Sequence, residues 1–122
     1  MKIQFGKLED IENYADTYIG IIPGGINSKK DLFRSYAEAL RFPGYFGFNW
    51  DALDECLSDF HWIKDKKNIL IYHVDIPDID EKEKVILLSV LINNIFENSD
   101  GSLIVMFPEK YKERIKILLD KI

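Results

Sequence analysis

Continuous hydrophobic runs alternate along the chain with segments in which hydrophobic residues recur every three or four positions. The continuous runs are Tyr18–Ile22, Asn68–Val74 and Ser102–Phe107. Unbroken runs of this length are typical of strands that are buried on both faces of a parallel sheet. The intervening segments are expected to be helices, because parallel strands need long crossover connections. The pattern therefore predicts a two-layer α/β fold, with a small three-stranded parallel sheet packed against helices.

Cap residues and proline place the first two predicted helices. Ser28 is a favourable N-cap for a helix that is expected to end near Arg41, because Pro43 disfavours helical geometry at the residue before it. Asn49 is a favourable N-cap for a short second helix that runs to about Phe60.

Two further helices are expected in the second half of the chain. Asp80 can cap a long helix that runs to about Glu97, and apolar residues cover so much of its circumference that it should be largely buried. Amphipathic spacing predicts an additional C-terminal helix within residues 108–122. The N-terminal segment is ambiguous, although Ile3 and Phe5 could begin an extra edge strand.

Length and composition favour one folded domain over residues 1–122. The chain is 47% hydrophobic and 30% charged, with 7 Gly and 4 Pro, which excludes a disordered or linker-like protein. Its 16 Lys and Arg against 21 Asp and Glu give a formal charge of -5. Nucleic acids and anionic lipids attract excess positive charge, so we expect neither nucleic acid nor a membrane as a direct partner.

The chain is expected to be cytoplasmic. Cys56 is the single cysteine and cannot form an internal disulfide, which favours a reducing compartment. The segment Met1–Asp10 lacks the apolar core of a signal peptide, and the most apolar stretch, Val85–Ile92, is too short to span a bilayer. A monomer is the default expectation.

The segment Phe42–Ile63 departs most from the average composition. It holds both tryptophans and several other aromatic residues, and it contains acidic residues but no Lys or Arg. Helical spacing places one group of side chains on the core face: Leu53, Cys56, Leu57 and Phe60. The same spacing places a polar group on a different face: Asp51, Asp54, Glu55 and Ser58. The missing positive charge suggests that this acidic face serves a cationic partner.

The loop before this helix contains two aromatic residues between glycines. Gly44 and Gly47 bracket Tyr45 and Phe46, and such a loop can hold a fixed turn while it projects a ring outward. Aromatic rings beside charges are typical of protein–protein hot spots. The same rings could instead fasten the loop to the core, and composition leaves both interpretations open.

Enzymatic and metal chemistry fit the sequence less well. Asp51 or Asp54 could pair with Glu55 in acid–base catalysis, but such a pair needs a cleft, and these residues are expected on a convex helix face. His61 and His73 are isolated from other ligand-type residues. We therefore expect no catalytic residue, no metal site and no cofactor.

Residues 43–53 read PGYFGFNWDAL and are followed by Cys56-Leu57. This segment resembles the motif of the barstar family of ribonuclease inhibitors, Pro-x-Tyr-aromatic-Gly-x-Asn-x-Asp-Ala-Leu with Cys-Leu a few residues on. The order of predicted elements agrees with that family over about residues 17–107. The resemblance implies a barstar-like fold and an intracellular inhibitor, an immunity protein of the toxin–antitoxin kind, that blocks a ribonuclease without performing chemistry.

The resemblance also implies a site for a basic ribonuclease or a related toxin protein. Tyr45 and Phe46 match the loop aromatics of the family's interface, Asn49 matches the cap of its binding helix, and Asp51 and Glu55 match interface carboxylates. The full set of expected partner-binding residues is Tyr45, Phe46, Gly47, Asn49, Trp50, Asp51, Asp54, Glu55, Ser58 and Asp59.

Two departures from the family pattern bear on the partner. Asp54 stands where the archetype has a tryptophan, and Glu55 is one methylene longer than the archetype's aspartate. The hypothesis is phosphate mimicry, in which carboxylates contact the Lys, Arg and His that hold RNA phosphates. The alternative is that the same fold binds another basic protein or a non-ribonuclease toxin, because a fold does not fix a partner.

Overall fold

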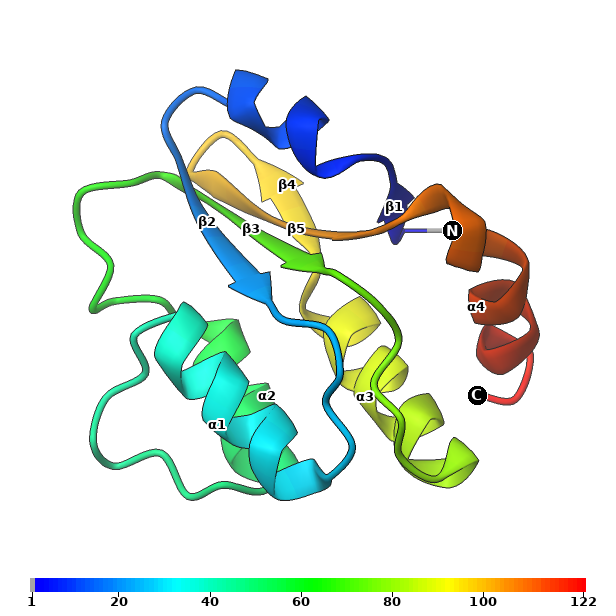
Figure 1. The fold of residues 1–122 in the computed structure, drawn as a ribbon. Helices are drawn as coiled ribbons and strands as arrows, with labels where there is room; N and C mark the ends of the chain where they lie inside the picture. The colour runs from blue at the N-terminus through cyan, green and yellow to red at the C-terminus, as the bar shows by residue number, and fades with distance from the viewer. Residues whose placement is uncertain (1) are drawn as a thin grey trace.

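The computed structural model describes residues 2–122, apart from the side chains of Glu12, Asn13 and Asn98. Within these residues, one sheet has a layer of helices against one face (Figure 1). The strands are β1 (Gln4–Phe5), β2 (Thr17–Ile22), β3 (Asn68–His73), β4 (Phe96–Asn98) and β5 (Gly101–Phe107). The helices are the 3-10 helices η1 (Leu8–Asn13) and η2 (Glu109–Tyr111) and the α-helices α1 (Lys29–Ala39), α2 (Trp50–Ser58), α3 (Glu81–Asn94) and α4 (Lys112–Leu119).

The sheet is mainly parallel. β1, β5, β3 and β2 lie side by side in that order, and each neighbouring pair is parallel. β4 is antiparallel to β5 and pairs with its first residues, whereas β1 pairs with its end, so both lie on the same edge of β5. The predicted α/β fold with a parallel sheet is confirmed. The sheet is wider than the predicted three strands, because β1 and β4 extend it.

The main core lies between the sheet and the layer formed by α1, α2 and α3 (Figure 1). Each helix contributes a buried hydrophobic stripe to the core, and the stripe of α2 consists of Leu53, Cys56 and Leu57. A fully buried leucine contributes about 1.5–3 kcal/mol to stability, so such stripes hold the layer in place. A smaller cluster on the opposite face joins Ile11 of η1 to β3 and β5.

The third helix ends at Asn94, so its predicted extension to about Glu97 is wrong. Ile95 adopts extended geometry, and the next residues form β4, in which Phe96 pairs with Leu103. Gly101 has a φ of +147° at the turn into β5, and a Cβ there would lie 2.4 Å from the carbonyl oxygen of Lys67. These residues form the β4–β5 hairpin instead of another helical turn, because the chain must reverse direction to place β5 in the sheet.

The predicted caps of α1 and α2 are confirmed. The Ser28 hydroxyl accepts a hydrogen bond from the backbone N–H of Asp31 at 3.1 Å. Asn49 Oδ1 accepts one from the backbone N–H of Ala52 at 2.8 Å. Asp80 occupies the predicted N-cap position of α3, but its side chain makes no capping hydrogen bond there.

The start of the loop between α1 and α2 is set by an unusual helix end. Arg41 adopts a left-handed φ of +54°, and the backbone N–H of Phe42 donates to the carbonyl of Ala37 at 2.9 Å. This is a Schellman-type bond, which normally uses glycine at the left-handed position. The Arg41 guanidinium lies 4.6 Å from the centre of the Tyr18 ring, a cation–π contact that helps to hold the turn.

His73 is a buried member of the core at the end of β3. The Tyr36 hydroxyl lies 2.5 Å from His73 Nε2, and the His73 ring stacks on Phe107 with centroids 4.6 Å apart. Burial lowers the pKa of His73 to about 3, because the charged imidazolium loses its hydration.

Among the described residues, none of the helices has the length and apolar character that a membrane crossing requires.

The cap at Asn49 predicts a stability loss on truncation. Asn49→Ala removes the bond to the Ala52 N–H and should lower the free energy of unfolding by about 1 kcal/mol. Urea unfolding of the variant measures this change. Asn93→Ala, at an exposed position of α3, is the matched control and should leave stability unchanged or slightly higher. Equal losses in both variants would contradict the cap role.

Burial of His73 predicts a specific acid sensitivity. The pKa of His73 is lower in the folded than in the unfolded chain, so acidification protonates the unfolded state first, and stability falls as the pH drops below about 6.5. This loss should reach about 3 kcal/mol by pH 4. His73→Gln keeps an acceptor for Tyr36 and does not titrate. The gap in unfolding free energy between wild type and variant should therefore shrink by that amount, and a gap independent of pH would contradict the assignment.

Candidate functional site

The buried stripe of α2 fixes which of its side chains face solvent. With Leu53, Cys56 and Leu57 packed against the core, the opposite side of the helix is exposed. That side is the acidic face, and it consists of Asp51, Asp54, Glu55 and Ser58. The predicted division of α2 into a core face and an acidic face is confirmed. Cys56 is buried as predicted, and burial raises the pKa of its thiol.

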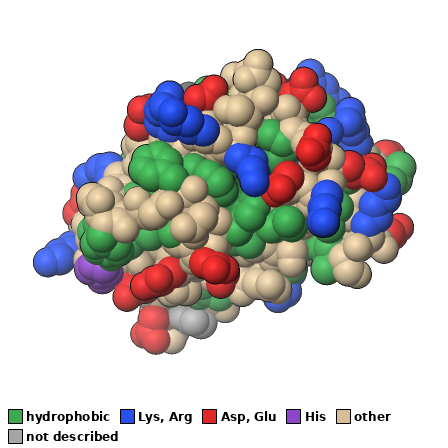
Figure 2. All heavy atoms as spheres, turned by 90° about the horizontal axis from the view of Figure 1, so that it is seen from below, with side chains coloured by type: hydrophobic (Ala, Val, Ile, Leu, Met, Phe, Trp, Pro, Cys, Tyr) green, Lys and Arg blue, Asp and Glu red, His purple; other side chains and the backbone are tan. Residues whose placement is uncertain are grey.

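The carboxylates of the acidic face are exposed to solvent. In the part of the chain that the structure describes, no Lys or Arg forms an ion pair with Asp51, Asp54 or Glu55. Asp51 and Glu55 are one helical turn apart, a like-charge spacing that costs an isolated helix about 0.2–0.5 kcal/mol. Acidic side chains gather beside hydrophobic ones on the face of the molecule seen in Figure 2.

Asp59 lies at the end of α2 and is engaged locally. Its Oδ1 accepts a hydrogen bond from the backbone N–H of His61 at 3.0 Å, and its Oδ2 lies 3.6 Å from His61 Nδ1. Both side chains are exposed. Asp59 therefore extends the negative charge of the acidic face toward a histidine, the only group among the described residues that forms an ion pair with it.

Tyr45 is the exposed ring of the loop. It is 66% exposed, and desolvation raises the pKa of its hydroxyl, with smaller contributions from Cys56, Glu55 and Asp59. Tyr45 belongs to the loop that leads into α2, four residues before the Asn49 cap of that helix.

Phe46 lies inside the molecule, which corrects the expectation that its ring is presented to a partner. It is only 7% exposed, and its ring centre lies 4.8 Å from that of Phe42 and 6.3 Å from that of Phe33. The sequence alone did not show whether Tyr45 and Phe46 contact a partner or pack against the core, and the structure assigns them different positions. Phe46 fastens the loop to the core, whereas Tyr45 faces solvent.

Phe48 is the exposed residue that the sequence analysis did not include. It is 50% exposed and has a left-handed φ of +53°, and its ring packs on Phe46 with centroids 5.1 Å apart. The left-handed position of this loop is therefore at Phe48 rather than at Gly44 or Gly47. Its position between Gly47 and Asn49 could have indicated this exposure, because an aromatic residue in a loop there belongs to no buried face of a helix or strand.

The first turn of α2 is tied to its surroundings by Asn49 and Trp50. Asn49 Nδ2 donates to the carbonyl of Gly47 at 3.2 Å, and a Cβ at Gly47 would lie 3.3 Å from that nitrogen. Trp50 is half-buried, packs edge-on against Phe33 at 4.9 Å and donates from Nε1 to Glu83. Both residues therefore support the site from within, and only part of the Trp50 ring is open to a partner.

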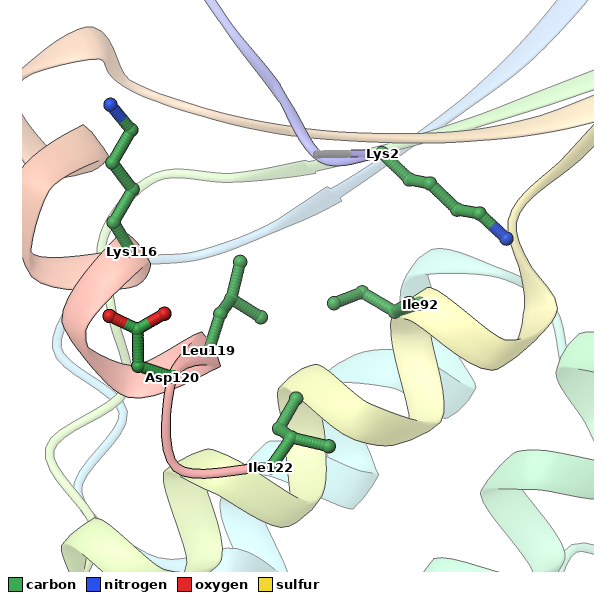
Figure 3. A pocket seen from close by; sticks show the side chains of 6 residues that line it. All are labelled: Lys2, Ile92, Lys116, Leu119, Asp120 and Ile122. Carbon is green, nitrogen blue, oxygen red and sulfur yellow. The ribbon is translucent and has the colours of Figure 1, made fainter.

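A separate hollow lies between α3 and α4, away from the acidic face (Figure 3). It has a volume of about 620 Å³ and a hydrophobic lining of Ile92, Leu119 and Ile122. Lys2, Lys116 and Asp120 line it too, but in Figure 3 the two lysine side chains extend in different directions rather than toward a common point. Small-molecule sites need polar groups that converge, which this hollow lacks. No cluster of His, Cys, Asp and Glu suited to a metal ion occurs among the described residues.

Comparison with known proteins identifies the fold. A family model described as barstar (barnase inhibitor) matches residues 20–107, a stretch that begins within β2 and ends with β5. A comparison with curated protein sequences gives no significant match. The matched stretch contains the aromatic loop and the whole of α2, whereas η1 and α4 lie outside it. Proteins of this family are inhibitors rather than enzymes. The chain belongs to the barstar (barnase inhibitor) family.

Proposed function

We propose that this protein blocks the active site of a barnase-type ribonuclease with the acidic face of α2 and the ring of Tyr45. Membership in the family implies a barnase-type ribonuclease inhibitor. The observation that supports this surface is the exposure of Asp51, Asp54 and Glu55 without an intramolecular cation in the described chain. Such carboxylates are free to pair with the positive groups of a partner.

The chemistry of a ribonuclease cleft fits these carboxylates. Lys, Arg and His side chains bind the phosphates of RNA, and charge-assisted hydrogen bonds to carboxylates are of the same kind. A short rigid helix that carries Asp51 and Glu55 one turn apart can place two carboxylates where two phosphates would bind. The nuclease is then blocked sterically and electrostatically, and no bond is made or broken.

Tyr45 adds an apolar anchor to this charged surface. An exposed aromatic ring loses little conformational freedom on binding and buries a large area, so such rings dominate many interfaces. The buried Phe46 beneath it holds the loop in place before the partner arrives. Asp54 in the middle of α2 and Ser58 and Asp59 at its end complete the surface.

Removal of the Glu55 carboxylate should separate binding from stability. Glu55→Ala should weaken binding to barnase by about 2 kcal/mol or more, because a central charge partner is lost. The free protein should be as stable as wild type or slightly more stable, since Glu55 forms no ion pair within the described chain and repels Asp51. Titration of barnase-catalysed RNA cleavage measures the first effect and urea unfolding the second.

Glu113→Ala provides the matched control for this experiment. Glu113 is an exposed glutamate of α4, outside the family match, and the substitution changes the net charge by the same amount. Inhibition by this variant should equal that of wild type. Equal inhibition by Glu55→Ala and wild type would remove Glu55 from the site. Binding of another basic protein without inhibition of any barnase-type ribonuclease would favour the alternative partner class.

The acidic face should also accelerate association. Opposite charges steer the two proteins together, and salt screens this attraction. The association rate constant with barnase should fall about tenfold or more between about 20 and 500 mM salt. Stopped-flow fluorescence measures the rate, and an association rate that is indifferent to salt would contradict steering by this surface.

A further inference from the structure

Helix α3 makes two side-chain hydrogen bonds to α2, one to its first residue and one to its middle. At the first turn, Trp50 Nε1 donates to Glu83 Oε2 at 2.7 Å. Glu83 Oε1 also accepts from Lys29 Nζ of α1 at 3.3 Å, and the Glu83 side chain is only 22% exposed. One partly buried carboxylate thus joins the starts of α1, α2 and α3.

The second bond acts directly on a carboxylate of the acidic face. Asn94, the last residue of α3, donates from Nδ2 to Asp54 Oδ1 at 2.7 Å. The same nitrogen donates to the carbonyl of Val90 at 2.8 Å, which holds the amide against its own helix. Asp54 is therefore oriented by a group that is itself fixed, whereas Asp51 and Glu55 have no side-chain hydrogen bond among those the structure gives for the described residues.

We propose that Glu83 and Asn94 of α3 are positioning residues, which pre-organise the acidic face for its partner. The inference rests on the proposed function, but it assigns a role to residues outside the surface that contacts the nuclease. Asn94 holds the Asp54 carboxylate in one orientation, and Glu83 holds the indole of Trp50, the residue next to Asp51.

The physical reason is the cost of ordering side chains during binding. An exposed aspartate samples several rotamers, and immobilising it in a complex costs free energy that lowers affinity. A neutral amide donor fixes the carboxylate without cancelling its charge, which a lysine or arginine at the same place would do. Asn94 is thus suited to orient Asp54 and to leave its negative charge available to a cation of the partner.

Pre-organisation should appear in the dissociation rate. Asn94→Ala should make the complex with barnase dissociate about three- to tenfold faster, because Asp54 must then be ordered during binding. The association rate should change less than about twofold, since the charge of the surface is unaltered. Asn93→Ala, at the neighbouring exposed position of α3, is the matched control and should leave both rates unchanged.

A double-mutant cycle separates positioning from general support of the fold. The effect of Asn94→Ala on dissociation should disappear in the Asp54→Ala background, because Asn94 acts through that carboxylate. In the same way, Glu83→Ala should accelerate dissociation in wild type but not in Trp50→Phe, which lacks the indole N–H. Glu83→Gln keeps an acceptor for Trp50 and should restore slow dissociation. Urea unfolding of every variant shows that each is folded under the assay conditions.

The possible results distinguish this inference from the proposed function. Equal effects of Asn94→Ala in both backgrounds, or no effect on dissociation, would overturn the positioning role. If Glu55→Ala still weakens binding in that case, the proposed function stands without it. Failure of the wild-type protein to bind any barnase-type ribonuclease would overturn both the positioning role and the proposed function.

Discussion

The burial of Leu53, Cys56 and Leu57 beneath α2 is the constraint on which the rest of the surface depends. A helix has 3.6 residues per turn, so once this stripe is buried in the core, the carboxylates on the opposite side must face solvent. Asp51 and Glu55 repel each other, and no Lys or Arg of the described chain forms an ion pair with either of them. Core packing therefore maintains a concentration of charge that an isolated helix would not favour. The hydrophobic stripe and the acidic face are two results of one orientation.

The elements that obey local rules were predictable from the sequence. Hydrophobic periodicity predicts the strands β2, β3 and β5 and the two faces of α2, and side chains that reach their own backbone predict the Ser28 and Asn49 caps. The end of α3 was not predictable in this way. Residues after Asn94 have hydrophobic neighbours on both sides, and only their pairing with β5 decides that they form a strand. Asp80 shows a related limit, because it occupies the predicted N-cap position without making a side-chain hydrogen bond to the helix.

The same distinction between local and long-range information applies to the candidate site. The sequence showed which carboxylates share a face, because that requires only helical geometry. It could not show which loop aromatic is internal, because Phe46 is buried by Phe33 and Phe42, and the α1 helix that carries Phe33 is set by the sheet. The bonds from Glu83 and Asn94 join residues 33 and 40 positions apart, and no local pattern carries that information. Long-range packing thus determines how the site is held, whereas sequence spacing determines what it contains.

The unequal edges of the sheet have a consequence for association through backbone pairing. On one side, β5 is covered by β1 and β4, which have 2 and 3 residues, whereas the opposite side ends in β2 with 6. Short strands offer few backbone groups to a neighbouring chain, so among the described strands only β2 is a substantial template at an edge of the sheet. Fibre growth requires a template on both sides of each added molecule. A sheet with one long open edge can pair through that edge with the same edge of a second copy. The resulting dimer then has no long open edge to which a third copy could add.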